Sequence, residues 1–146
     1  MVQHPIDASA LIQAPAAKIY GIIADYRNTH PLILPKPYFI SLDVEKGGTG
    51  AGTVINFTMR LMGPAQSFRA TISEPEPGRR LVETTDQGPV TSYRVEPEGG
   101  ATRVTIHTDM PVPDGAAGKF QGWLAERLLR PIYAKELAQL AALAEA

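Results

Sequence analysis

The sequence contains no cysteine and only three histidines. Without cysteine, the chain can form no disulfide, no thiolate metal site and no cysteine nucleophile. The histidines His4, His30 and His107 lie far apart, so none pairs with another at the spacing typical of metal ligands. We therefore expect no metal and no other cofactor. The lack of cysteine also fits a reducing compartment.

Neither an excess of one charge nor a long apolar run is present. The 14 lysines and arginines nearly balance the 15 acidic residues, for a net charge of −1, which argues against nucleic acid as a partner. No segment approaches the roughly 18 apolar residues of a transmembrane segment. Met1–His4 lacks the charged and apolar blocks of a signal peptide. We expect a cytoplasmic protein whose residues 1–146 form a single domain.

Turn residues divide the chain into short segments. Thirteen prolines and thirteen glycines are spread between stretches whose apolar residues alternate with polar ones, which predicts strands. The predicted strands are Ile6–Gln13, Tyr38–Lys46, Thr53–Met62, Gln66–Glu74, Arg80–Thr85, Val90–Glu96 and Thr102–Met110. Most of these strands follow one another through tight turns, so we expect antiparallel neighbours. Two short helical segments are predicted after the first strand, at Ala16–Asp25 and near Leu32–Leu34.

A long helix is predicted to close the chain, from Gly115 to Ala146, with Asp114 as its N-cap. Pro131 lies inside it. Because proline removes a backbone hydrogen bond, we expect two helical halves joined at a kink, with two separate helices as the alternative. One apolar stripe precedes the proline and a second, rotated stripe follows it. These stripes comprise Phe120, Trp123, Leu124 and Leu128, then Ile132, Tyr133, Leu137, Leu140 and Ala144.

An antiparallel sheet with one apolar face must bury that face, and the closing helix is the only long cover in the sequence. A single straight helix cannot fill the hollow of a strongly curved sheet, so we expect a cavity between them. The predicted fold is α+β: a curved seven-stranded antiparallel sheet wrapped around a long C-terminal helix, with two short helices after the first strand.

Several apolar and hydroxyl side chains are candidates to line this cavity. The apolar candidates are Phe57, Met59, Phe68, Ile106, Phe120, Trp123 and Leu124, and ordinary core packing is the alternative role for each. Thr108 lies in phase with Ile106 on the same strand. The hydroxyls of Tyr26, Tyr38 and Tyr93 need a partner, which can be a ligand oxygen or another side chain.

Histidine and glutamate supply the remaining candidates. His30 follows the first predicted helix, where the cavity would open, as a ligand contact or a plain loop residue, whereas His107 is expected to face solvent. If Leu81 faces the helix, so does Glu83, and an apolar cavity would raise the pKa of its carboxyl toward values suited to proton transfer. If Val82 faces inward instead, Glu83 points to solvent, and the pattern leaves both phases open.

Catalytic motifs are scarce. The chain has no Gly-x-Ser-x-Gly sequence and no clear Ser/His/Asp set, so Glu83 and Tyr93 are the only weak catalytic candidates. The glycines of residues 48–52 precede a strand rather than a helix, which favours a hairpin loop over a phosphate-binding loop and leaves a place at the cavity mouth open.

Taken together, these segments resemble the START-like, Bet v 1-like (SRPBCC) superfamily with its helix-grip fold, in particular the polyketide cyclase/dehydrase and lipid-transport type. The matching segments are Ile12–Tyr20, Ala24–Tyr26, Glu74–Val82, Tyr93–Pro97, Gly100–Thr105 and Arg130–Pro131. A tryptophan often follows the first helix in that family, and here His30, Pro31 and Leu32 stand in that region. The resemblance implies a hydrophobic cavity for lipids, sterols, polyketides or quinones, and its relatives include enzymes, carriers and partner-binding proteins.

From the pattern and the resemblance, we predict that the protein binds a small lipophilic molecule between the sheet and the closing helix, and that it could carry that molecule. Two alternatives remain. One is a polyketide cyclase/dehydratase-like enzyme that uses the same cavity. The other is a stress-responsive or partner-responsive interaction module. Formation of a homodimer is left open as well.

Overall fold

A computed structural model describes residues 1–146. In chain order the elements are β1 (Val2–Ile12), α1 (Ala16–Ala24), α2 (His30–Ile33), β2 (Phe39–Lys46), β3 (Val54–Met59), β4 (Gln66–Glu76), β5 (Arg80–Thr85), β6 (Val90–Glu98), β7 (Ala101–Val112) and α3 (Gly115–Ala144). This is the predicted order of elements. None of the helices is long and apolar enough to cross a membrane.

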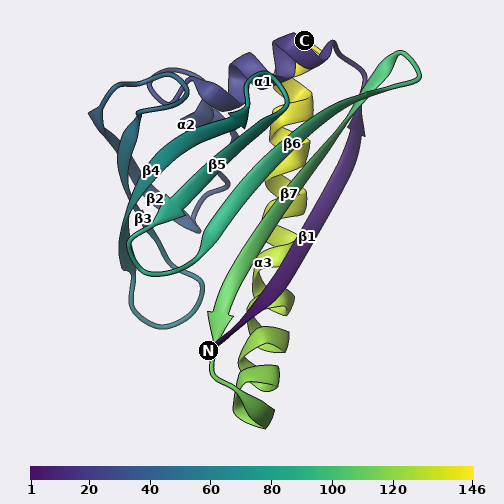
Figure 1. Ribbon diagram of the computed structural model, residues 1–146. Helices are drawn as coiled ribbons and strands as arrows, with labels where there is room; N and C mark the ends of the chain where they lie inside the picture. Colours follow the sequence, from purple (N-terminus) through teal and green to yellow (C-terminus); the bar gives the residue numbers. More distant parts are fainter.

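The seven strands form one antiparallel sheet in the order β1-β7-β6-β5-β4-β3-β2. Strands β2 to β7 follow the chain because tight turns join them, and β1 adds to the far edge by pairing with β7, with Ile6 opposite Thr108. Figure 1 shows the sheet curving across α3, while α1 and α2 lie at the end near the C-terminus. The predicted α+β helix-grip architecture is confirmed.

Several strands are longer or shorter than predicted. β1 begins at Val2 because that residue still pairs with Val112 of β7. β4 continues to Glu76, opposite Arg80 across a register shift. β3 ends at Met59, where its pairing with Gln66 ends. Backbone pairing with a neighbouring strand therefore sets these ends, whereas side-chain alternation within one strand does not report it.

The closing helix α3 runs without interruption through Pro131, so the alternative of two separate helices is wrong. Pro131 is exposed, while Leu129 before it and Ile132 after it are buried. Packing on both sides of the proline offsets the lost backbone hydrogen bond. Asp114 occupies the N-cap position as predicted, but its side chain makes no capping hydrogen bond; it lies 3.7 Å from the ammonium group of Met1.

The hollow face of the sheet is covered by three helices rather than by α3 alone. Ile19 and Ile23 of α1 and Ile33 of α2 are fully buried, and they join Leu137 and five other buried hydrophobic residues of α3 in one core cluster: Leu129, Ile132, Tyr133, Leu140 and Ala144. The expectation of a single covering helix is wrong because the short helix α1 has an apolar face of its own, which packs into the same core. In Figure 1 the first turns of α3 extend past the end of β1 and β7, beyond this core.

The glycine-rich stretch 48–52 is a hairpin loop between β2 and β3, and it packs against the end of α1. Gly50 N–H donates to the carbonyl of Ala24 (3.0 Å). Ala51 N–H donates to Oε1 of Glu74 (2.7 Å), and the hydroxyl of Tyr20 donates to Oε2 of the same carboxylate (2.6 Å). Glu74 therefore fastens both the loop and α1 to β4. The loop does not line the cavity described below.

Substitution of Gly50 tests this attachment. Gly50 has φ 65°, and a Cβ added to it would lie 2.3 Å from Oε1 of Glu74. We expect Gly50→Ala to lower the free energy of unfolding by about 2–4 kcal/mol, because a left-handed backbone costs an alanine about 1–2 kcal/mol and each hydrogen bond that Glu74 loses costs about 1 kcal/mol. Urea-induced unfolding measures the loss.

Gly52 supplies the matched control for this substitution. Its φ is 89°, but an added Cβ would meet nothing within 4 Å. Gly52→Ala should therefore lose only the backbone contribution, about 1–2 kcal/mol. Equal losses for the two alanine variants would show that Glu74 does not hold the loop.

Candidate functional site

A cavity of about 950 Å³ lies between the sheet and α3. It is lined by 31 residues, of which 17 are hydrophobic. Phe57 and Phe68, whose rings stack with centroids 5.1 Å apart, line it from β3 and β4, and Leu124 lines it from α3. Exposed lining residues such as Met62 mark its open end, and buried lining residues such as Glu136 mark its closed end.

Eight of the thirteen side chains predicted to contact a ligand line this cavity. They are His30, Phe57, Met59, Phe68, Glu83, Tyr93, Thr108 and Leu124. Tyr26 is fully buried behind Glu83, and Ile106 belongs to the core, so neither lines the cavity. Tyr38 is also absent from the lining, and the ammonium group of Lys135 lies 5.2 Å from the centre of its ring.

Phe120 and Trp123 were predicted as ligand contacts, and the structure places both on the surface, 61% and 53% exposed. Their rings lie 6.0 Å apart, and the guanidinium of Arg127 lies 5.5 Å from the ring of Trp123. Gln121, Leu124 and Leu128 of the same turns line the cavity, so Phe120 and Trp123 lie on another side of the helix, which faces solvent. The predicted stripe joined residues from both sides, because helical spacing alone does not show where the buried face ends.

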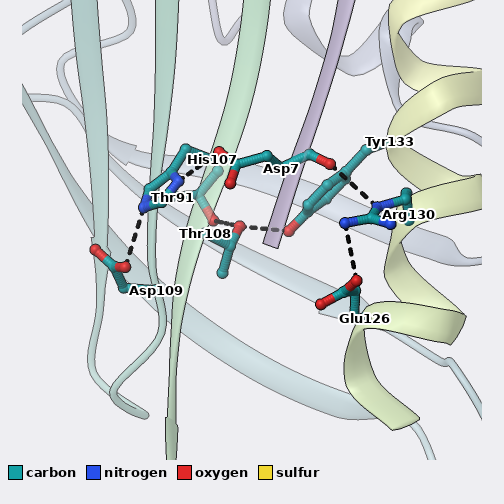
Figure 2. A network of polar contacts seen from close by, with 8 residues as sticks. All are labelled: Asp7, Thr91, His107, Thr108, Asp109, Glu126, Arg130 and Tyr133. Atoms are coloured by element: carbon teal, nitrogen blue, oxygen red, sulfur yellow. Dashed lines mark hydrogen bonds and ion pairs between the residues drawn. The ribbon is translucent and has the colours of Figure 1, made fainter. Parts of the chain in front are cut away.

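Two important lining residues were missed because they follow Pro131, where only plain packing was expected. Tyr133 and Glu136 both line the cavity and are buried. The hydroxyl of Tyr133 lies 2.5 Å from Oγ1 of Thr108, which lies 2.8 Å from Oγ1 of Thr91, as Figure 2 shows. The sequence contained a signal for Glu136, because this carboxylate directly precedes Leu137 in the apolar stripe of the helix. A charged residue is seldom buried unless it has a partner or a function.

The closed end of the cavity holds a buried cluster of polar side chains, which we call the inner cluster: Tyr26, His30, Glu83, Tyr93 and Glu136. The hydroxyl of Tyr26 donates to Oε2 of Glu83 (2.5 Å), and the hydroxyl of Tyr93 donates to Oε2 of Glu136. The ring of His30 stacks on Tyr26 at 4.2 Å and meets Tyr93 edge-on at 5.6 Å. The cluster therefore connects two carboxyl groups through three aromatic rings.

Each member of the inner cluster is fixed by its own element. Glu83 lies on β5 between Ile72 of β4 and Thr91 of β6, with its side chain inward, which decides between the two phases that the sequence left open. His30 is the first residue of α2, and its Nδ1 contacts the carbonyl of Ile23 (2.6 Å). These positions come from β5, α2 and the chain after α1, segments that only the fold brings together.

Burial sets the protonation states in the inner cluster. It raises the pKa of Glu83 to about 7, against the opposing hydrogen bond from Tyr26. It also raises the pKa of Glu136 to about 8; the bond from Tyr93 opposes this shift and the charge of Glu83 adds to it. Burial lowers the pKa of His30 to about 4, so its ring is neutral at pH 7. The 3.6 Å contact between His30 and Glu83 is therefore not an ion pair.

A second set of polar contacts lies outside the cavity and ties α3 to β1 (Figure 2). Arg130 donates to the backbone carbonyl of Asp7 (3.3 Å) and pairs with Glu126 (2.8 Å). His107 of β7 bonds to the carboxylates of Asp7 (2.6 Å) and Asp109 (3.0 Å). His107 thus lies on the outer face of the sheet, opposite Ile106, as its alternation predicts, with its side chain 34% exposed.

The arrangement offers two chemical capacities in one space. Its apolar walls can bury the body of a lipophilic molecule, and its closed end presents two carboxyl groups that change protonation near neutral pH. Proton transfer and hydrogen bonding to a ligand are both within the reach of these groups. No lysine or arginine lines the cavity to neutralise them.

The raised carboxyl pKa values predict that the folded state loses stability as the pH rises. The unfolded chain releases these protons near pH 4.5, whereas the folded protein holds them until about pH 7 and 8. His30, whose pKa is lowered, opposes this trend only below pH 6.5. Between pH 6.5 and 8.5 we expect the free energy of unfolding to fall by roughly 2 kcal/mol, measured by urea unfolding at each pH.

Glu136→Gln should remove most of this fall, because an amide accepts the Tyr93 hydrogen bond but does not titrate. Comparing the slopes of wild type and variant cancels the contributions of other titrating groups, including His107. Burial lowers the pKa of the His107 ring, but its bonds to Asp7 and Asp109 raise it, and the net result is a raised pKa. The exposed residue Glu96 provides the control, and Glu96→Gln should keep the wild-type slope. A wild-type slope in Glu136→Gln would contradict a buried, protonated Glu136.

Comparisons with known proteins place this geometry in a family. Residues 3–145 match the family model described as polyketide cyclase / dehydrase and lipid transport. A search of curated proteins gave no match. Among solved structures, the KanY protein is 26% identical, with full coverage of both chains and a TM-score of 0.88.

Two further structures share the fold at lower identity. The Zhui aromatase/cyclase from Streptomyces sp. R1128 is 12% identical over 98% of this chain and 94% of its own, with a TM-score of 0.78. A START superfamily protein from Mycobacterium smegmatis is 14% identical over 97% of both chains, with a TM-score of 0.73. Because the family model covers residues 3–145, the chain belongs to the polyketide cyclase/dehydrase and lipid transport family.

Proposed function

We propose that the protein binds a small lipophilic molecule in the cavity between the sheet and α3. The observation that carries this proposal is the cavity itself, about 950 Å³ in volume and lined mainly by hydrophobic residues. Pockets for small molecules have volumes of roughly 300–1,000 Å³ and comparable linings. The family description, which includes lipid transport, supports the same function.

The walls suit a flat, ring-containing body. Phe57 and Phe68 present stacked rings on one side, and Leu124 and Leu128 of α3 line the other. A ligand that buries about 200 Å² of apolar surface there would gain about 5 kcal/mol before the entropic cost of binding.

Carriage of the ligand, the cytoplasmic location, the single domain and the homodimer stay predictions from the sequence.

Partly filling the cavity should weaken binding. Ala125 of α3 lines the cavity, so the ring introduced by Ala125→Phe would occupy part of it. We expect this variant to bind Nile red, a neutral apolar dye, at least tenfold more weakly than the wild type, because the dye and the new ring compete for the same volume. Fluorescence titration measures the affinity, and native mass spectrometry with solvent extraction reveals a molecule that copurifies.

The control is Ala138→Phe, on the exposed face of the same helix. This variant adds the same ring outside the cavity and should bind the dye like the wild type. A wild-type protein that excludes the dye and carries no ligand, or equal binding by both variants, would overturn the proposed function.

A second candidate function is favoured by the two buried carboxyls of Glu83 and Glu136. Their pKa values of about 7 and 8 match what general acid–base catalysis needs near neutral pH. The family description and the aromatase/cyclase among the structural relatives suggest dehydration. A carboxylate would remove the proton next to a ketone, a protonated carboxyl would give its proton to the departing hydroxyl, and a β-hydroxy ketone would become an enone and water.

This reaction predicts a selective effect of Glu83→Gln. The variant should dehydrate a naphthyl β-hydroxy ketone at least about 100-fold more slowly, since an amide can neither take nor give the proton. Its dissociation constant for that ketone should stay within about threefold of the wild type. The ultraviolet absorbance of the enone reports turnover, with Glu96→Gln as the control. No turnover by the wild type, or equal turnover by Glu83→Gln, would contradict this second function.

A further inference from the structure

We propose that the closed end of the cavity recognises one uncharged oxygen of the ligand, of the carbonyl type, through the paired carboxyl groups of Glu83 and Glu136, and rejects an anionic group in that position. This inference rests on the proposed binding function and adds the chemical class of the ligand's polar end. Three observations support it: each carboxyl group has one oxygen without a protein partner, no lysine or arginine lines the cavity, and the hydroxyls of Tyr26 and Tyr93 are bonded to the two carboxyls.

Each carboxyl group has one oxygen left for a ligand. Oε2 of Glu83 accepts the hydroxyl of Tyr26, and Oε2 of Glu136 accepts the hydroxyl of Tyr93. The Oε1 atoms of the two glutamates bond to no protein group. Every side-chain nitrogen or oxygen that is fully enclosed has a hydrogen-bond partner, so these two Oε1 atoms are not fully enclosed. Because both residues line the cavity, these two oxygens are the ones that face it.

The charge of the lining excludes an anion at this end. No lysine or arginine is among the 31 lining residues. His30 is the one basic side chain of the inner cluster, and burial keeps it neutral by lowering its pKa to about 4. A carboxylate or phosphate would therefore lose its hydration beside Glu83 and Glu136 without gaining a cation, which is strongly unfavourable in a buried site.

The two tyrosines bonded to the carboxyls do not supply free donors. Tyr26 and Tyr93 direct their hydroxyls to the two carboxyls. The hydroxyl of Tyr133 shares a hydrogen bond with Thr108 in which either atom can donate. At the carboxyl pair itself, the donors for a ligand oxygen are the O–H groups of the protonated carboxyls. Burial raises the pKa of both carboxyls, which keeps a proton available at pH 6.5.

At the closed end of the cavity, only the carboxyl pair changes charge between pH 6.5 and 9. The other titratable groups that face it are Tyr26 after α1, His30 of α2, Tyr93 of β6 and Tyr133 of α3. Burial raises the pKa of all three tyrosines above its usual value, and His30 is already neutral. As the pair loses its protons, it changes from a donor to an acceptor. Affinity for a carbonyl oxygen must then fall, whereas affinity for a cation would rise.

Four anthracenes that differ in one substituent test this recognition. They carry an acetyl, an ethyl, a carboxylate or an aminomethyl group at the same ring position, and isothermal titration calorimetry at pH 6.5 and 9 gives their dissociation constants. At pH 6.5 we expect the acetyl compound to bind about tenfold more tightly than the ethyl compound and at least 30-fold more tightly than the carboxylate. At pH 9 the advantage of the acetyl group over the ethyl group should disappear.

A Glu83→Gln, Glu136→Gln double variant tests the role of the pair directly. Its amide groups donate hydrogen bonds without titrating, so it should retain the preference for acetyl over ethyl at pH 9. The wild-type series alone keeps the inference falsifiable if this variant does not fold.

The outcomes separate this inference from the binding function. Equal affinity for the acetyl and ethyl compounds at pH 6.5, tight binding of the carboxylate, or tightest binding of the aminomethyl compound would overturn the recognition of an uncharged oxygen and leave cavity binding intact. Failure of all four compounds to bind would overturn both.

Discussion

The structure depends on one packing constraint: the hollow face of a curved seven-stranded sheet must be covered, and one helix is too narrow to fill it. The second half of α3 buries Leu137 and Leu140, and α1 and α2 close the end of the sheet near the C-terminus. The space that these helices leave unfilled is the cavity. The cavity therefore follows from the width of a helix and the curvature of the sheet, and no separate binding domain is needed to form it.

The inner cluster is costly to place in that space. Two carboxyl groups lose most of their hydration there, and burial without partners would cost several kcal/mol for each. Tyr26 and Tyr93 reduce this cost by donating to one oxygen of each carboxyl, and protonation reduces it further. The same features that make the cluster tolerable hold its protons near neutral pH, so its structural cost and its chemical capacity have one cause.

Binding and catalysis are closely related possibilities in this geometry. Both use the apolar walls to hold the body of a molecule and the inner cluster to meet a polar group. They differ in whether the protons of Glu83 and Glu136 only form hydrogen bonds or also move to the ligand. Family membership fits either outcome, since the family description includes both cyclase/dehydrase and lipid transport. The charge state of the pair is the property on which both functions depend.

The sequence by itself determined the order of elements, the antiparallel sheet and the inward alternation of residues such as Phe57 and Phe68, because side-chain period and turn residues are local properties. Local patterns could not decide the phase of Glu83, whose neighbours Leu81 and Val82 are both buried.

Only the tertiary structure showed that Phe120 lies outside the cavity and that Glu136, beyond Pro131, lies inside it. The physical reason is that spacing along a helix shows which residues share a face, whereas packing against the sheet decides which of them are covered. Residues distant in the chain, such as Tyr93 and Glu136, come into contact only when the sheet packs against the helix.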